Sequence, residues 1–90
     1  MGTALLKIKI MLSSPNVNPE EIKKKAKPAI EKYGGKNCRF EEELIAFGLK
    51  ALIACFDISE EQELEPIEEG LRKIKNVQSV QVTDMRRAFG

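Results

Sequence analysis

Few side chains in this sequence are of the kinds that make or break covalent bonds. The chain contains no histidine, and its two cysteines, Cys38 and Cys55, lie too far apart to form a Cys-x-x-Cys pair. Zinc and iron–sulfur centres use clusters of such residues at short spacings, and many general-base mechanisms use histidine. We therefore expect no metal site and no cofactor. We interpret both cysteines as small apolar core residues that form no disulfide.

The other polar groups form no recognisable catalytic set. The loop at residues 13–18, Ser-Ser-Pro-Asn-Val-Asn, offers hydroxyl groups but has neither the glycines nor the arginine that a phosphate-binding loop uses. The acidic stretches at residues 41–43 and 60–69 are most simply solvated surfaces, because no nucleophile or base accompanies them. The sequence therefore predicts a protein that is not an enzyme and that carries out no bond-making or bond-breaking chemistry.

Two features suit binding to a partner. The most apolar run, residues 43–56, is broken by Gly48, which predicts two strands joined by a tight turn with Phe47 at its tip. Such an aromatic side chain either folds back over its own hairpin or inserts into a partner, and both interpretations stay open. Near the end of the chain, Arg86 and Arg87 form a basic pair that is either a solvated tail or a cationic contact.

Length and charge limit the classes of partner. The 90 residues are one domain's length, and 42% of them are hydrophobic. The 15 Lys and Arg residues nearly balance the 14 Asp and Glu residues, so the net charge of +1 gives no general attraction to nucleic acid or to an anionic membrane. The first twelve residues are too short and too interrupted by Lys7 and Lys9 for a signal peptide or a membrane span. We expect a cytoplasmic protein with no direct nucleic-acid or membrane partner.

Hydrophobic spacing and turn residues predict six elements. They are strands at residues 4–12, 37–45, 49–58 and 77–82, and helices at residues 19–33 and 66–76. Asn18 is expected to cap the first helix, and Pro28 to kink or shorten it. Gly70 weakens the second helix by roughly 1 kcal/mol relative to alanine, which predicts a close packing contact at that position.

The order strand-helix-strand-strand-helix-strand is that of the ferredoxin-like α+β sandwich. Right-handed crossovers put both helices on one face of a four-stranded antiparallel sheet, which we expect in the spatial order 4-1-3-2. The first and third strands, which are rich in apolar residues, are then central. If the hairpin turn is centred between Ala46 and Phe47, Cys38 and Cys55 lie directly opposite each other.

This topology also predicts where the binding features lie. We expect the last strand to run parallel to the first, and the hairpin turn to lie at the end of the sheet where both strands finish. Phe47, Lys50 and the Arg86–Arg87 pair then share one end of the domain. An aromatic anchor beside cations is a composition typical of binding hot spots. For Lys50 alone, a solvated surface position is the simpler interpretation.

RNA-recognition domains have the same element order, but they stack bases on aromatic residues of the two central strands. Here the first strand has no aromatic residue, and the third has only Phe56, which we interpret as part of the core. A second function class stays open: a ferredoxin-like regulatory module that binds a small ligand or self-associates through its sheet. Such a module would change its thermal stability with ligand or with protein concentration.

Several stretches match a known family. They are Ile45-Ala46-Phe47-Gly48-Leu49-Lys50-Ala51-Leu52, Ile67-Glu68-Glu69, Val77-Gln78-Ser79-Val80-Gln81-Val82, Ile8-Lys9-Ile10-Met11 and the Ser14-Pro15 turn. With these residues the sequence resembles the archaeal elongation factor 1-beta group and the catalytic C-terminal domain of its eukaryotic relatives. The Phe-Gly-Leu-Lys hairpin is the most specific part. The resemblance extends over essentially the whole chain and implies a single guanine-nucleotide exchange domain at residues 1–90.

The resemblance implies a factor that promotes exchange of GDP for GTP on elongation factor 1-alpha, the GTPase that delivers aminoacyl-tRNA in protein synthesis. It implies that Phe47 inserts into the GTPase, with Gly48 and Lys50 on the docking hairpin. In the family, a lysine near the C-terminus approaches the magnesium site of the GTPase and loosens the diphosphate. Its position falls on Arg87, with Arg86 as the neighbouring candidate. We expect a monomer when the protein is free.

Overall fold

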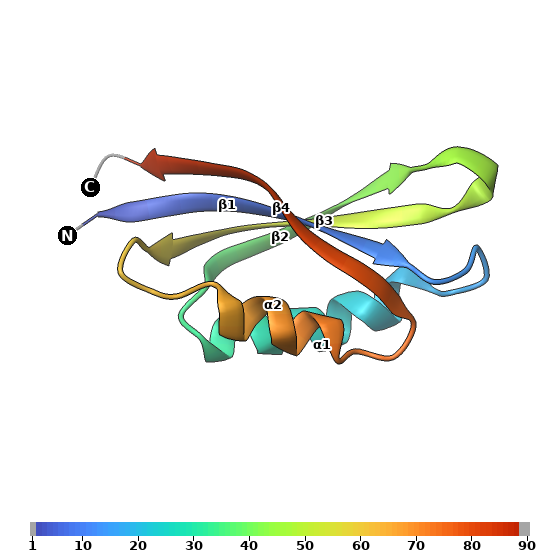
Figure 1. Ribbon diagram of the computed structural model, residues 1–90, viewed down its shortest axis with the longest axis horizontal. Coiled ribbons are helices and arrows are strands. Elements are labelled where there is room, and N and C mark those ends of the chain that lie inside the picture. Colours follow the sequence, from blue (N-terminus) through green and yellow to red (C-terminus); the bar gives the residue numbers. More distant parts are fainter. Residues whose placement is uncertain (1, 89–90) are drawn as a thin grey trace.

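The computed structural model describes residues 2–88 as a four-stranded sheet with two helices (Figure 1). The elements are β1 (Thr3–Leu12), α1 (Pro19–Lys32), β2 (Lys36–Leu44), a short 3-10 turn (Ala46–Gly48), β3 (Lys50–Ser59), α2 (Glu65–Arg72) and β4 (Val77–Ala88). The strands lie in the order β2-β3-β1-β4, and every neighbouring pair is antiparallel. The expected ferredoxin-like α+β fold and its sheet order are therefore confirmed.

Strict alternation along β1 builds the centre of the core. Leu6, Ile8 and Ile10 are buried, because every second side chain of a strand points to the same face. Both helices cover this face, as Figure 1 shows, and they contribute Ile22 and Ile67 to the same cluster. The opposite face of the sheet carries no helix, and Leu5 and Lys7 of β1 are exposed there.

Local sequence determines where α1 begins. The side-chain oxygen of Asn18 accepts a hydrogen bond of 3.0 Å from the backbone N–H of Glu20, and Pro19 occupies the first helical position, where no N–H is needed. The helix continues through Pro28 to Lys32, so the proline does not shorten it. In the described part of the chain, neither helix is long and apolar enough to cross a membrane.

The second helix ends earlier than its hydrophobic spacing predicted. It stops at Arg72 with Lys73 as its cap, and the chain reaches β4 through Asn76, whose φ of 73° is left-handed. A Cβ atom built at Gly70 would lie 3.7 Å from the Cβ of Ala29 on α1. The two helices therefore approach each other closely at this glycine, as expected, although the space admits one methyl group.

The register of the β2–β3 hairpin differs from the expected one by a single residue. Cys55 pairs with Arg39, and not with Cys38. The turn is centred on Phe47, with the N–H of Ile45 donating to the carbonyl oxygen of Leu49 at 2.7 Å, and a register shift follows between Lys36 and Arg39. A shift of one residue moves a side chain to the other face of a sheet. Cys38 accordingly packs against the core beneath the helices, whereas Cys55 is buried on the opposite face.

The expectation that β4 runs parallel to β1 is wrong. Ala4 pairs with Arg87 and Leu12 with Val77, so the two strands run in opposite directions. The α2 crossover returns the chain to the end of the sheet where β1 finishes, so β4 must run back toward the start of β1. The strand also continues to Ala88, through residues expected to form a tail. Figure 1 shows the consequence: the β2–β3 turn and the end of β4 lie at opposite ends of the molecule, which is 42 Å long.

Candidate functional site

The hairpin tip, residues 44–50, presents an aromatic side chain to solvent. Phe47 is 95% exposed, so it does not fold back over its own hairpin. Its backbone has a φ of 64°, a left-handed conformation that costs an L-residue roughly 1–2 kcal/mol. Leu44, which is 74% exposed, adds a second apolar side chain at the end of β2. A strained and fully exposed phenylalanine contributes nothing evident to the fold, and it is suited to burial in a partner.

Gly48 completes the shape of this turn. Its φ is 77°, and a Cβ atom placed on it would meet nothing within 4 Å. The glycine is therefore required for its backbone conformation and not for lack of space. Two consecutive left-handed residues, Phe47 and Gly48, reverse the chain within a short turn and leave the phenylalanine at its outermost point.

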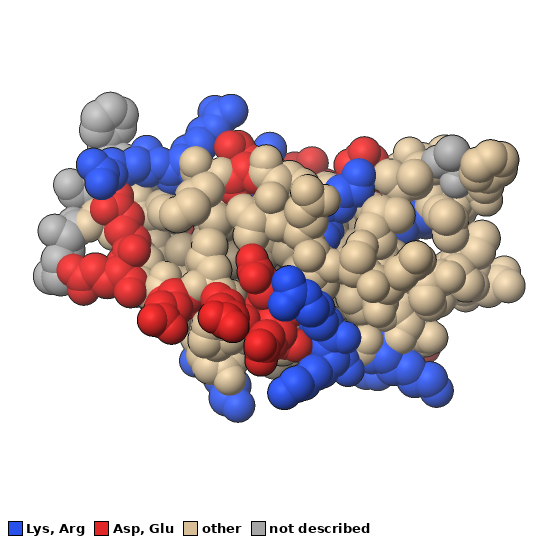
Figure 2. Space-filling model, in the orientation of Figure 1, with Lys and Arg blue, Asp and Glu red and all other residues tan. Residues whose placement is uncertain are grey.

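Charged side chains lie behind the tip and neutralise one another. The Nζ of Lys50 lies 3.8 Å from an Oε of Glu42, and the other Oε of Glu42 lies 3.5 Å from the Nζ of Lys23. A hydrogen bond to Glu20 raises the pKa of Lys23, and the nearby charge of Glu42 adds to this effect. Lys50 is thus partly compensated by Glu42, while the end of the molecule that carries the hairpin is mostly uncharged in Figure 2.

The arginine end is formed by Arg86 and Arg87, in the last part of β4. The Nε of Arg86 lies 3.1 Å from an Oδ of Asp84, and the Nε of Arg87 lies 2.7 Å from an Oε of Glu60. Successive strand residues point to opposite faces, so Arg86 lies on the open face of the sheet and Arg87 on the helix side. Their side chains are 76% and 82% exposed. The two arginines therefore do not converge on one point.

The structure does not bring the predicted site residues together. Phe47, Gly48 and Lys50 share the hairpin tip, as the sequence indicated, but Arg86 and Arg87 lie at the far end of the sheet. Sequence reasoning also missed two residues. The sequence predicts Leu44 only as one residue of an edge strand rich in acids. Glu60 contacts Arg87, which lies in a distant segment of the chain. Nothing in the local sequence indicates the contact of Glu60.

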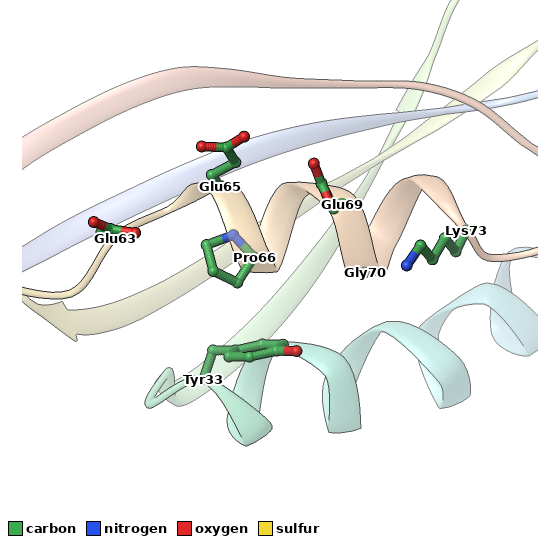
Figure 3. Close-up of a pocket in the computed structure, with 7 residues that line it drawn as sticks. All are labelled: Tyr33, Glu63, Glu65, Pro66, Glu69, Gly70 and Lys73. Carbon is green, nitrogen blue, oxygen red and sulfur yellow. The ribbon is translucent and has the colours of Figure 1, made fainter.

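Among residues 2–88, no group of three or more His, Cys, Asp or Glu side chains could hold a metal ion. A hollow of about 340 Å³ lies between the helices. It is lined by Tyr33, Glu63, Glu65, Pro66, Glu69, Gly70 and Lys73. In Figure 3, the ring of Tyr33 faces Pro66, whereas the carboxylates of Glu65 and Glu69 point away from the ring. The carboxylates and the tyrosine therefore do not converge on a ligand.

Comparison with known proteins identifies the family of this chain. Residues 5–88 match the family model of the EF-1 guanine nucleotide exchange domain. A protein named elongation factor 1-beta from Methanocaldococcus jannaschii is 40% identical over 89 residues, covering 98% of this chain and 100% of the relative. Another of the same name, from Methanosarcina barkeri, is 41% identical over 88 residues and covers 97% and 99% of the two chains. A third, from Methanococcus vannielii, is 34% identical over 86 residues, covering 94% and 97%. The chain therefore belongs to the EF-1 guanine nucleotide exchange domain family, together with these archaeal proteins named elongation factor 1-beta.

Proposed function

We propose that this chain promotes the release of GDP from elongation factor 1-alpha, so that GTP can bind. It acts as a single exchange domain, in the cytoplasm, without bond-making chemistry of its own. The observation that carries the proposal for the docking site is Phe47, an aromatic side chain that is 95% exposed on a strained backbone. Family membership supplies the class of partner, and the exposed tip supplies a contact that the fold itself does not use.

Phe47 is proposed as the docking anchor. A phenylalanine that becomes buried removes a large apolar area from water, and buried aromatic anchors at interface centres contribute 2 kcal/mol or more, as an order of magnitude. Gly48 gives the tip its shape. Lys50 lies at its edge, 3.8 Å from Glu42, and it adds a polar contact at the rim of the interface.

Arg87 is proposed as the residue that disturbs the nucleotide site. GDP is held on such GTPases through phosphate contacts and a magnesium ion that bridges protein and phosphate oxygens. A cation that enters this region competes with the metal for the same negative oxygens. A guanidinium is a poor steric replacement for a bare ion. Because it is planar and presents several N–H donors, it competes instead by binding phosphate or carboxylate oxygens.

Exchange then follows from linkage. A factor that binds the nucleotide-free GTPase more tightly than the GDP-bound form must lower the affinity for GDP by the same ratio. Phe47 and Arg87 lie at opposite ends of a sheet whose central strand β3 has ten residues, which corresponds to roughly 30 Å. A GTPase that contacts both residues must therefore lie along the length of this domain.

The decisive experiment is the release of a fluorescent GDP analogue from the cognate elongation factor 1-alpha, with the present protein in substoichiometric amount. We expect acceleration over many turnovers. The variant Phe47→Ala should lose most of this activity, whereas Phe47→Tyr keeps the ring and should retain it. The proposal is overturned if the folded wild-type protein leaves GDP release unchanged, and Phe47 leaves the site if Phe47→Ala is fully active.

A further inference from the structure

The guanidinium of Arg87 is held in place by a residue from another part of the chain. Glu60 follows β3 directly, and one of its Oε atoms lies 2.7 Å from the Nε of Arg87 near the end of β4. The Glu60 side chain is 25% exposed, so it lies against the surface, while the Arg87 side chain is 82% exposed. The contact uses the nitrogen nearest to the chain and leaves the two terminal nitrogens of the guanidinium facing solvent.

Glu60 is itself placed by Gly2. The N–H of Glu60 donates a hydrogen bond of 3.0 Å to the carbonyl oxygen of Gly2. A Cβ atom at Gly2 would lie only 2.6 Å from the same Oε atom that contacts Arg87. The carboxylate therefore fits between the first residues of the chain and β4 because position 2 has no side chain. Three segments that are distant in sequence meet at this point.

We propose that Glu60 is a positioning residue for nucleotide exchange, which holds Arg87 in the orientation in which its terminal nitrogens reach the GTPase. This inference rests on the proposed role of Arg87. A long arginine side chain loses up to about 2 kcal/mol of conformational entropy when a partner immobilises it. Glu60 removes part of that loss beforehand, because its carboxylate already holds the guanidinium in a close ion pair of 2.7 Å.

A carboxylate beside Arg87 has a second possible effect, which is to weaken its positive charge. The two effects predict opposite outcomes. Positioning predicts that loss of Glu60 slows exchange, whereas charge weakening predicts that it accelerates exchange. The geometry favours positioning, because the acid contacts Nε and leaves the outer edge of the guanidinium open to a ligand.

Asp84 provides a matched control on the same strand. It contacts Arg86 through the same nitrogen, Nε, at 3.1 Å, but Arg86 points to the other face of the sheet. Asp84→Ala removes one acid from this end of the molecule, as Glu60→Ala does, and leaves the contact between Glu60 and Arg87 in place. The two variants therefore have the same net charge and differ in which arginine loses its partner.

The experiment measures kcat/KM for GDP release with Glu60→Ala, Glu60→Gln, Gly2→Ala and Asp84→Ala. Glu60→Ala should lower it by about two- to fivefold, the range that an exposed ion pair supplies. Gly2→Ala should give a similar loss without changing any charge, because its methyl group displaces the carboxylate. Glu60→Gln should lower it to a similar extent, because a neutral amide cannot form the ion pair with the guanidinium. Asp84→Ala should be unaffected, and thermal unfolding should be similar in all four variants.

A second measurement separates this inference from the proposed function. In NMR relaxation measurements, the Nε–H bond of Arg87 should be more ordered in the wild type than in Glu60→Ala and Gly2→Ala, whether or not a GTPase is present. In an Arg87→Ala background, Glu60→Ala should cause no further loss of exchange activity. If Glu60→Ala is as active as the wild type or more active, the inference is overturned, while the exchange function stands. If the wild-type protein does not accelerate GDP release from the GTPase, the proposed function is overturned, and the role of Glu60 in exchange falls with it.

Discussion

Phe47 and Arg87 lie at opposite ends of the sheet. Leu44 pairs with Lys50 beside the hairpin tip, and at the other end Ala4 pairs with Arg87. The central strands β1 and β3 run the full length between these pairs. A partner that uses both residues cannot do so in one pocket, so the domain would act as a rigid spacer between an apolar anchor and a cationic group.

This separation predicts independent contributions from the two residues. Phe47→Ala and Arg87→Ala should each lower kcat/KM for GDP release by at least about tenfold, which corresponds to a loss of about 1.4 kcal/mol or more. In the double variant the two losses in free energy should add, because distant sites without shared partners couple weakly. Kinetics of GDP release for the four proteins of the cycle give the coupling energy. A double variant that is no worse than the poorer single variant would place both residues in one cooperative step and contradict separate contacts.

The strained backbone of Phe47 predicts that stability and activity change in opposite directions. Phe47→Gly relieves a left-handed conformation that costs about 1–2 kcal/mol, against about 0.5–1 kcal/mol for the greater freedom of glycine in the unfolded chain. The free energy of unfolding should therefore rise by about 0.5–1 kcal/mol in urea titrations. Exchange activity should fall, because the docking ring is lost.

The neighbouring glycine is the control for this prediction. Gly48→Ala should lower the free energy of unfolding by about 1 kcal/mol, because its φ of 77° strains any L-residue while a Cβ there meets no other atom within 4 Å. If Phe47→Gly is destabilising while Gly48→Ala is neutral, the turn does not hold the conformation described here.

Two other glycines predict opposite effects on stability. Gly70→Ala should raise the free energy of unfolding by about 0.5–1 kcal/mol, because alanine favours the helix and its methyl group would lie 3.7 Å from the Cβ of Ala29. Gly35→Ala should lower it by about 1–3 kcal/mol, because the new methyl group would overlap Ile30 and press on Phe56. Thermal and urea unfolding check both variants. A destabilised Gly70→Ala protein would show that the helices are closer than this structure places them.

The thiol of Cys38 predicts a loss of stability at alkaline pH. Burial, with a smaller effect from the charge of Glu31, raises the pKa of Cys38 from its ordinary value of 9.0 to about 11. The unfolded chain therefore loses this proton at a lower pH than the folded protein does. The contribution of Cys38 to the free energy of unfolding is present below pH 9 and declines as the pH rises from about 9 to about 11.

The variant Cys38→Ser isolates this effect, because its hydroxyl group does not titrate in that range while the lysines and the tyrosine are unchanged. Urea unfolding of both proteins at several values of pH should show a steeper decline for the wild type above pH 9. Parallel curves for the two proteins would mean that the Cys38 thiol is as accessible in the folded state as in the unfolded chain.

The sequence by itself determined which elements form and which faces they bury. The alternation of Leu6, Ile8 and Ile10 predicts a strand with one buried face, and Asn18 with Pro19 predicts the start of α1, because these signals depend on residues within one or two turns of each other. The phenylalanine beside Gly48 could likewise be placed at a turn. Its near-complete exposure could not be predicted, because a phenylalanine that folds back over the hairpin and one that projects outwards have the same sequence.

Only the tertiary structure decided the register of the hairpin and the partner of Arg87. The direction of β4, by contrast, follows from the predicted order 4-1-3-2, because in an antiparallel sheet the strand beside β1 runs opposite to it; the expectation of a parallel β4 contradicted that order. A turn centred on Phe47 moved Cys38 away from Cys55 by one position, a change that no local pattern records. The contact between Glu60 and Arg87 joins the ends of two strands that meet only when the sheet is complete, because β1 lies between β3 and β4 and holds both in register.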